Sequence, residues 1–220
     1  MKFTFKQFMV PNFGKRLAFM LPAVILMGVF VSLLLEVNWG TDPASFMNQN
    51  ISHTIGLSFG TTEVIVYGLM LIFTFIFGPQ MIGFGTIANM VLIGYIADFC
   101  RWLWKTTGFH DYLTAASFSF VLFIFVIAIV FFVLTAAIYM NAQMGVAPYD
   151  ATASIIAGWM PKVPFFVVRI IYDFLMVGIG VLFALFSPDG MQGSLVGSIV
   201  MSILIGPAVQ LVGKPLSKIL

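Results

Sequence analysis

Two charged residues in the second half of the chain are spaced to act together. Arg169 and Asp173 are four residues apart, so they share one face if the segment is helical. Lys162 marks the expected start of that helix, which puts Asp173 about 16 Å along it and near the middle of a bilayer. Charges at that depth are costly, and they either pair with each other or bind a substrate or coupling ion. The spacing is equally compatible with a structural ion pair and with a binding site.

Two short segments that begin with a Gly-x-x-Pro motif contribute further polar groups. Asp42 and Pro43 are typical of a helix start, because Asp caps exposed amides and Pro suits the first helical position. The amino terminus of a helix also carries free amides and the positive end of the helix dipole, which attract an anion or a substrate carboxylate. A capping residue can therefore line a site as well. We predict these substrate-binding residues: Asp42, Pro43, Asn48, Pro148, Tyr149, Asp150, Arg169 and Asp173.

The remaining charged residues have simpler explanations. Asp98, Arg101 and Lys105 lie along one end of an apolar segment, where snorkelling and mutual pairing account for them. Glu63 is expected at the membrane interface, at the start of another apolar segment. His110 is expected in an exposed loop.

The composition restricts the setting in which these residues work. Hydrophobic residues make up 61% of the 220 positions, charged residues make up 8%, and the mean hydropathy is +1.08. Soluble domains carry about 25% charged residues, so this sequence predicts an integral membrane protein surrounded by a lipid bilayer. The net charge of +2 is too weak to indicate nucleic-acid binding. Cys100 is the only cysteine, which excludes a multi-cysteine metal site, and we expect no metal and no cofactor.

Six apolar segments are long enough to cross hydrocarbon, which takes about 20 helical residues. Two shorter and more polar segments, 42–56 and 148–158, would be about 16–22 Å long as helices. These two are expected to be re-entrant or interfacial half-helices that do not cross the membrane. The predicted fold is an all-α membrane protein with six transmembrane helices plus the two half-helices. The six predicted spans are residues 17–37, 61–78, 85–104, 113–139, 163–186 and 193–213.

The two halves of the chain contain matching motifs in the same order. Residues 40–43 and 145–148 both read Gly-x-x-Pro, and residues 85–94 match residues 197–206 from the first glycine to the last. Each half then holds a span, a half-helix and two further spans. An odd number of crossings turns the second copy over, so we predict two three-span inverted repeats. Small residues that recur in these motifs predict close helix packing at Gly85, Gly94, Gly197 and Gly206.

The basic residues orient the predicted spans, because Lys and Arg favour cytoplasmic loops. Both termini are expected in the cytoplasm of a multi-pass protein of the cell membrane, although Arg101 and Lys105 then lie outside. The basic residues that this orientation places inside are Lys2, Lys6, Lys15, Arg16, Lys162, Lys214 and Lys218. The chain divides into a basic and aromatic cytoplasmic amino-terminal segment, two repeats and a basic cytoplasmic tail, at residues 1–16, 17–107, 112–213 and 214–220.

The glycine-rich motifs also support a resemblance to known proteins. The matching parts are Gly40-Thr-Asp-Pro43, Gly56-Leu-Ser-Phe-Gly60, Gly83-Phe-Gly-Thr86 running to Gly94 and Asp98, Gly145-Val-Ala-Pro-Tyr-Asp150, Arg169 and Leu204-Ile-Gly-Pro207. In these motifs the sequence resembles the YczE/YyaS/YitT family of bacterial multi-span membrane proteins. The resemblance implies a membrane location and a shared architecture, and it names no substrate. Ala147 stands where the first half has Asp42, so a role that needs symmetric acids at that position is in doubt.

Two functions from different classes fit these features. The first is a small transporter or permeation pathway for a small solute or ion, with its site between the repeats, because inverted repeats make two equivalent arrangements available. The alternative is a non-transporting scaffold, regulator or substrate-capture subunit of a larger complex. We do not expect an enzyme, because the chain has no His-Glu-x-x-His motif and only two histidines. Whether the protein pairs with a second copy or with another membrane protein is left open.

Overall fold

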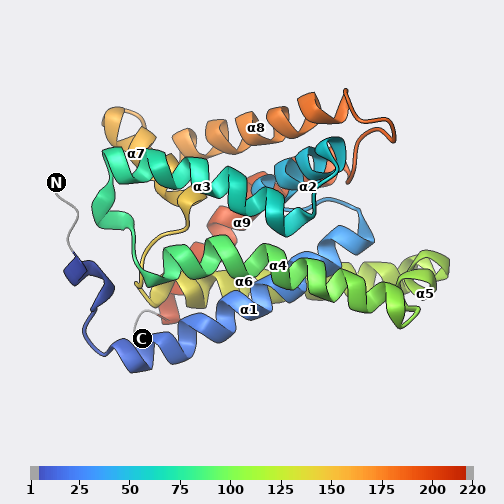
Figure 1. Ribbon diagram of the computed structural model, residues 1–220, viewed down its shortest axis with the longest axis horizontal. Helices are drawn as coiled ribbons and strands as arrows, with labels where there is room; N and C mark the ends of the chain where they lie inside the picture. Colours follow the sequence, from blue (N-terminus) through green and yellow to red (C-terminus); the bar gives the residue numbers. More distant parts are fainter. Residues whose placement is uncertain (1–4, 217–220) are drawn as a thin grey trace.

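The computed structural model describes residues 5–216, which are all-helical, with nine α-helices and two short 3-10 helices and no strand within that range (Figure 1). Residues 1–4 and 217–220, which include Lys2 and Lys218 of the predicted basic termini, lie outside the described residues. The α-helices are α1 (Phe13–Val37), α2 (Pro43–Ile55), α3 (Phe59–Phe77), α4 (Phe84–Thr106), α5 (Phe109–Ala115), α6 (Phe118–Asn141), α7 (Pro148–Trp159), α8 (Phe165–Ala184) and α9 (Leu195–Leu216). The 3-10 helices are η1 (Phe5–Phe8) and η2 (Pro79–Met81).

Five of these helices, α1, α3, α6, α8 and α9, are long and apolar enough to cross a membrane. The all-α membrane architecture is therefore confirmed. Helix α4 has 23 residues but carries Asn89, Asp98 and Arg101, and it is not among the five. The sixth crossing stays a prediction.

The two short helices have clear local start and stop signals. Helix α2 begins where the Asp42 side chain accepts a hydrogen bond from the Ser45 amide at 3.0 Å, with Pro43 in the first helical position. It ends at Gly56, whose φ of 72° suits a residue without a Cβ. Helix α7 begins at Pro148 without a side-chain cap, because Ala147 has no acceptor.

The helices form two bundles. The first bundle contains α1, α4, α6 and α9, and the second contains α2, α3, α7 and α8 (Figure 1). Each has its own hydrophobic core, with Met20, Val24 and Phe132 in the first and Met47 and Met176 in the second. Each bundle takes two helices from each half of the sequence, so neither half folds into a bundle of its own.

The helix packing within the first half recurs within the second half, and the packing between the halves recurs with the halves exchanged. Helix α1 packs on α4 as α6 packs on α9, and α2 packs on α8 as α7 packs on α3. The loop before α2 lies against the first turn of α9, where the Thr41 amide donates to Ser198 Oγ at 3.1 Å. The loop before α7 lies in the same way against the start of α4, where the Gly85 amide donates to the Met144 carbonyl at 2.7 Å. Matching motifs therefore occupy matching positions.

Three of the four glycines predicted to pack closely do so. A Cβ on Gly85 would lie 3.1 Å from the Met144 carbonyl oxygen, one on Gly94 would lie 2.6 Å from Gly60 Cα, and one on Gly197 would lie 1.8 Å from the Trp39 carbonyl oxygen. Among the described residues, a Cβ on Gly206 would meet no heavy atom of another helix within 4 Å. Gly206 is exposed, and the helices of this chain leave it open.

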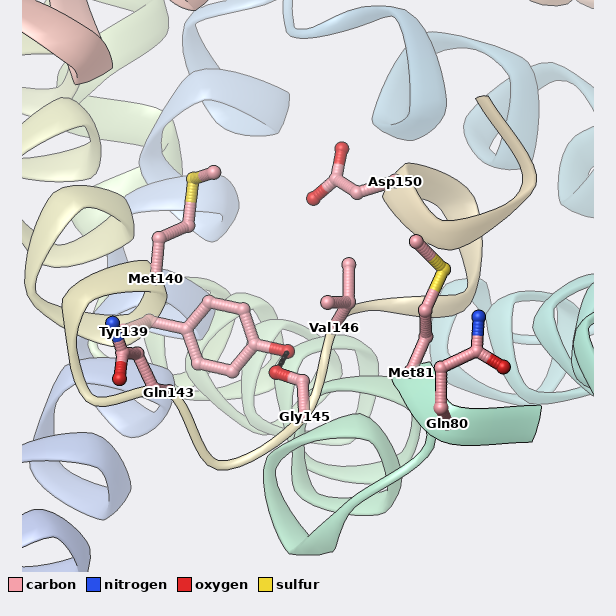
Figure 2. A pocket seen from close by; sticks show the side chains of 8 residues that line it. All are labelled: Gln80, Met81, Tyr139, Met140, Gln143, Gly145, Val146 and Asp150. Atoms are coloured by element: carbon pink, nitrogen blue, oxygen red, sulfur yellow. Dashed lines mark hydrogen bonds between the residues drawn. The ribbon is translucent and has the colours of Figure 1, made fainter. Parts of the chain in front are cut away.

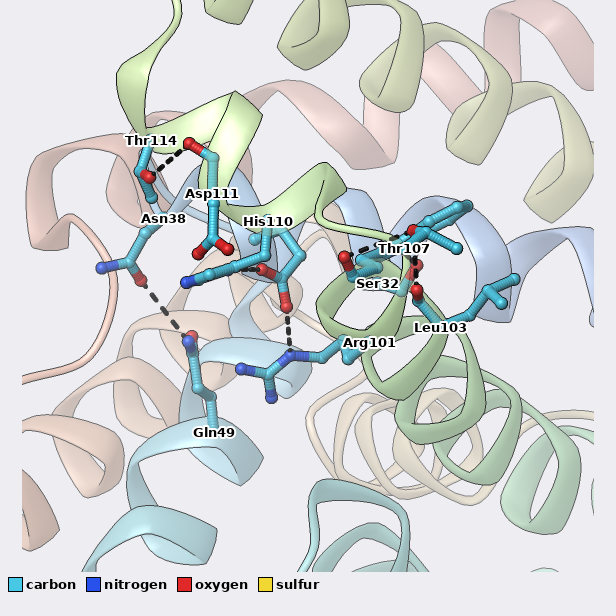
Figure 3. A network of polar contacts seen from close by, with 11 residues as sticks. Ser32, Asn38, Gln49, Arg101, Leu103, Thr107, His110, Asp111 and Thr114 are labelled. Atoms are coloured by element: carbon cyan, nitrogen blue, oxygen red, sulfur yellow. Dashed lines mark hydrogen bonds and ion pairs between the residues drawn. The ribbon is translucent and has the colours of Figure 1, made fainter.

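A polar network joins α1 to α4 and α5 at one end of the first bundle (Figure 3). Arg101 Nε lies 2.9 Å from Glu36 Oε1 and His110 Nδ1 lies 2.6 Å from Glu36 Oε2, while the Glu36 side chain is 1% exposed. The expectation of a loop at His110 was wrong, because His110 is in α5, where its side chain is 38% exposed and pairs with Glu36. Arg101 also does not pair with Asp98, which instead accepts a hydrogen bond from the Gly60 amide at 2.8 Å. Both misses have the same reason: the partners come from helices that are distant in sequence.

Candidate functional site

A cavity of about 560 Å³ lies between the two bundles. The first bundle contributes mainly apolar side chains to its walls, among them Met27, Val31, Phe132 and Ala136. The second bundle contributes most of the charged groups. The ionisable residues that line the cavity, tyrosines apart, are Asp42, Glu63, Asp150, Arg169 and Asp173.

Four of the predicted site residues form one cluster on the second bundle, which we term the Arg169 cluster: Tyr149, Asp150, Arg169 and Asp173. Arg169 Nη1 pairs with Asp150 Oδ1, and Arg169 Nε lies 3.0 Å from Asp173 Oδ1. The Tyr149 hydroxyl donates to the same Asp173 oxygen at 2.8 Å, and the guanidinium carbon lies 5.0 Å from the Tyr149 ring centre. Helical spacing on α8 brings Arg169 to Asp173, and the first turn of α7 brings Asp150 to both.

Two carboxylates contributed by the first half, Asp42 and Glu63, face the same cavity and are termed here the unpaired acids. Asp42 Oδ1 accepts from the Ser45 amide, but Asp42 Oδ2 is buried and has no hydrogen-bond partner within residues 5–216. Glu63 is 2% exposed and lines the cavity. No described group donates a hydrogen bond to Glu63, and no described basic side chain pairs with it. Both acids thus have unused capacity to bind a ligand.

The polar residues that line this cavity but were not predicted from the sequence include Glu63, Tyr67 and Asn89. Glu63 lines the cavity wall and does not face the surface, and Tyr67 and Asn89 are buried beside the same space, at 7% and 4% exposure. Neither Tyr67 nor Asn89 has a hydrogen-bond partner among the described residues. Glu63 and Tyr67 are four residues apart on α3, the same spacing that singled out Arg169 and Asp173 on α8. That spacing was the available signal.

Two predicted site residues lie behind the cavity wall. Pro148 is buried at the start of α7, where it positions Tyr149 and Asp150. Asn48 is fully buried in α2, and its amide nitrogen and oxygen have no partner among the described residues. Neither residue lines the cavity, whereas Pro43 does.

A second cavity of about 310 Å³ adjoins the first (Figure 2). Met140, Val146 and Asp150 line both spaces, so these three side chains form the partition between them. In Figure 2 the Asp150 carboxyl projects from α7 toward Met140, above Val146. Gln143, on the far wall of the smaller cavity, accepts from Arg16 Nη1 at 3.2 Å, so this cavity lies at the end of the molecule where α1 begins.

The apolar helices and the buried polar cavity define a multi-span membrane protein. A family model described as "Family of unknown function (DUF6198)" matches residues 14–214, and the chain belongs to this family. The chain is also 27% identical over 149 residues to the "Uncharacterized membrane protein YczE" of Bacillus subtilis (strain 168), which covers 66% of this chain and 65% of that protein. The match spans just under two thirds of that relative's length. The resemblance to YczE-type membrane proteins is confirmed, and no solved structure matches this chain.

Proposed function

We propose that the protein is a small transporter or permeation pathway whose substrate binds in the cavity between the two bundles. The observation that carries this proposal is the cavity itself, which has about 560 Å³ and is lined by charged residues from both halves of the sequence. Small-molecule sites typically measure about 300–1,000 Å³ and combine apolar walls with a few polar groups. A structural core of this size would be filled by side chains.

The proposed topology has six crossings, by α1, α3, α4, α6, α8 and α9, with both termini in the cytoplasm of a cell-membrane protein. Helices α2 and α7 have 13 and 12 residues, about 18–20 Å of helix against roughly 30 Å of hydrocarbon. Tyr149 at the start of α7 bonds Asp173 in the middle of α8, and Thr54 at the end of α2 bonds the Phe183 carbonyl at the end of α8. Because α7 ends just before α8 begins, the two short helices run to opposite ends. This geometry supports re-entrant helices in inverted repeats.

The two bundles are the natural moving parts of such a protein. They meet mainly where α3 packs on α4 and where α8 packs on α9, with the cavity between these contacts. A small rotation of one bundle on the other would open the cavity at one end and close it at the other, as alternating access requires. The partition of Met140, Val146 and Asp150 is the proposed gate toward the end where α1 begins.

The test is chemical access to the cavity from both sides of the membrane. Ser45 lines the cavity, so Ser45→Cys is placed in a Cys100→Ser background and treated with a small membrane-impermeant thiol reagent. Intact cells and inverted vesicles present the two sides in turn. We expect modification from both sides, because the transporter visits both open states. Thr107→Cys, exposed beyond the end of α4, is the control and should react from one side only.

Modification of Ser45→Cys from a single side, with Thr107→Cys behaving as expected, would contradict transport. That result would favour the alternative of a scaffold or substrate-capture subunit, whose site opens to one compartment. The same labelling at Thr107→Cys and at Lys162→Cys tests the topology. The proposed crossings place these two positions on opposite sides of the membrane.

A further inference from the structure

The cavity has an unbalanced set of charges. Four carboxyl groups and one guanidinium line it, tyrosine hydroxyls apart. The guanidinium of Arg169 is already held by Asp150 and Asp173. An anionic substrate would find no unengaged basic side chain among the described lining residues, and it would share the cavity with the carboxyl groups of Asp42 and Glu63. Like charges in a partly desolvated space repel strongly, so the cavity disfavours anions.

Among the acids that line the cavity, Glu63 has no partner at all in the described part of the chain. It is 2% exposed, it lines the cavity, and it has no hydrogen-bond or ion-pair partner among residues 5–216. A buried carboxylate without a partner is costly and becomes favourable when a positive group is placed against it. Asp42, on the same cavity, adds a second oxygen without a partner. These two acids come from the starts of different helices, α2 and α3, and line the same cavity.

The surroundings of the unpaired acids suit an organic cation better than a metal ion. The Tyr67 ring is one helical turn beyond Glu63, and its centre lies 6.5 Å from that of Tyr149, whose own ring already holds the Arg169 guanidinium at 5.0 Å. Aromatic faces bind ammonium groups in the same way. The opposite wall is apolar and can take a carbon skeleton. Within the described residues, no three His, Cys, Asp or Glu side chains converge as metal ligands.

We infer that the cavity binds small organic cations that carry an ammonium group, with Glu63 and Asp42 as counter-charges and Tyr67 beside them. Movement of the cation across the membrane rests on the proposed function. Binding of the cation does not depend on that function, and binding is tested on purified protein.

The experiment compares two probes of similar shape and opposite charge, benzylammonium and benzoate, in a thermal unfolding titration of the full-length protein in detergent at constant ionic strength. A ligand of the folded state raises the unfolding midpoint in proportion to RT ln(1 + [L]/Kd). We expect a saturable shift with benzylammonium and a Kd at least about tenfold lower than that of benzoate. Equal or tighter binding of benzoate overturns the inference. A shift with sodium or magnesium chloride and none with benzylammonium also overturns it.

Variants locate the binding. Glu63→Gln keeps the side-chain shape and removes the charge, and it should weaken benzylammonium binding by about tenfold or more. Asp111→Asn, which removes an exposed carboxyl from α5, is the matched control and should bind as the original protein does. Asp42→Asn is a second test that does not depend on the folding of the first variant, because Asn also caps a helix. Unchanged affinity in both Glu63→Gln and Asp42→Asn overturns the assignment.

The two proposals fail separately. Benzylammonium binding together with one-sided labelling of Ser45→Cys would reject transport and leave the cation site intact. Two-sided labelling together with a preference for benzoate would reject the cation site and leave transport intact.

Discussion

The two charged groups of the cavity differ in how their charges are satisfied. In the Arg169 cluster, both carboxylates share one guanidinium, and a tyrosine hydroxyl completes the set. The unpaired acids have no basic side chain beside them among the described residues. Yet the positions correspond: α3 begins at Phe59 and α8 at Phe165, so Glu63 and Arg169 are each the fifth residue of their helix.

The ninth residues of the two helices also correspond: Tyr67 on α3 matches Asp173 on α8. One half thus has an acid followed by a tyrosine where the other has a base followed by an acid. In the second half, Arg169 and Asp173 form an ion pair with each other. In the first half, Glu63 and Tyr67 line the cavity without a hydrogen-bond partner among the described residues. If the proposed cation site is correct, the second half stabilises the structure of the site and the first half binds the ligand, and the substitutions below test this division.

The largest effect is expected from Arg169→Met. It removes the shared guanidinium and leaves Asp150 and Asp173 without their cation, which in a buried ion pair costs about 3 kcal/mol. The free energy of unfolding, measured by titration with a denaturing detergent, reports the loss. Lys105→Met, which removes an exposed charge at the end of α4, is the control. A loss in Arg169→Met no larger than that of the control would show that the cluster does not hold the structure.

Next in size are substitutions at the glycines where the two halves meet. A Cβ on Gly197 would lie 1.8 Å from the Trp39 carbonyl oxygen, and one on Gly83 would lie 2.3 Å from the Met144 carbonyl oxygen. Both contacts are with backbone, which must shift, so Gly197→Ala and Gly83→Ala should each lose about 2 kcal/mol.

Gly178→Ala is the control for this pair, because a Cβ at Gly178 meets nothing within 4 Å and alanine favours a helix. Similar losses at Gly197 and Gly83 would mean that the halves differ in the cavity and not in their backbone contacts. A loss at only one of the two would contradict that equivalence.

A smaller effect, opposite in direction, is expected from Glu63→Gln without ligand. The substitution replaces a buried carboxyl group that has no partner among the described residues, so the free energy of unfolding should stay unchanged or rise by at most about 1 kcal/mol. Asp173→Asn is the comparison and should lower it, because Asp173 is held by Arg169 and Tyr149. Unfolding titrations of both variants show whether the free energy of unfolding rises or falls in each. Destabilisation by Glu63→Gln as large as that by Asp173→Asn would remove the distinction between the two groups.

The smallest effect is expected from Asp189→Asn. Asp189 lies 3.0 Å from His53, but its side chain is 74% exposed, and exposed pairs contribute about 0–1 kcal/mol. In the same unfolding titration, Asp189→Asn should change the free energy of unfolding by less than about 0.5 kcal/mol. A larger change would mean that an ion pair in this protein stabilises without burial. That result would weaken the explanation given for Arg169.

Much of the candidate site follows from local rules. The spacing of Arg169 and Asp173 and the helix starts at Pro43 and Pro148 depend only on neighbours in sequence, and the structure has all of these features. The structure then places Asp42, Tyr149, Asp150, Arg169 and Asp173 on one cavity. Local rules work here because helix periodicity and capping involve residues within four positions of each other.

The misses share a different origin. Glu63 looked interfacial because it is near the start of an apolar segment, and its burial depends on how α3 packs on α4. The pairing of His110 was missed because its partner Glu36 is 74 residues away. Gly206 looked like Gly94, its counterpart in the motif, but only Gly94 has another helix against it. In each case the deciding neighbour is distant in the chain.

Sequence alone determined that this chain is an all-helical membrane protein, where its short helices start and which charged residues share a helix face, because composition and short-range spacing decide these properties. Only the tertiary structure decided that each bundle draws helices from both halves, that a cavity lies between the bundles, and that Asp42 and Glu63 have no basic partner there within residues 5–216. These features depend on which helix faces are in contact, and those contacts are made between segments that are distant in the sequence.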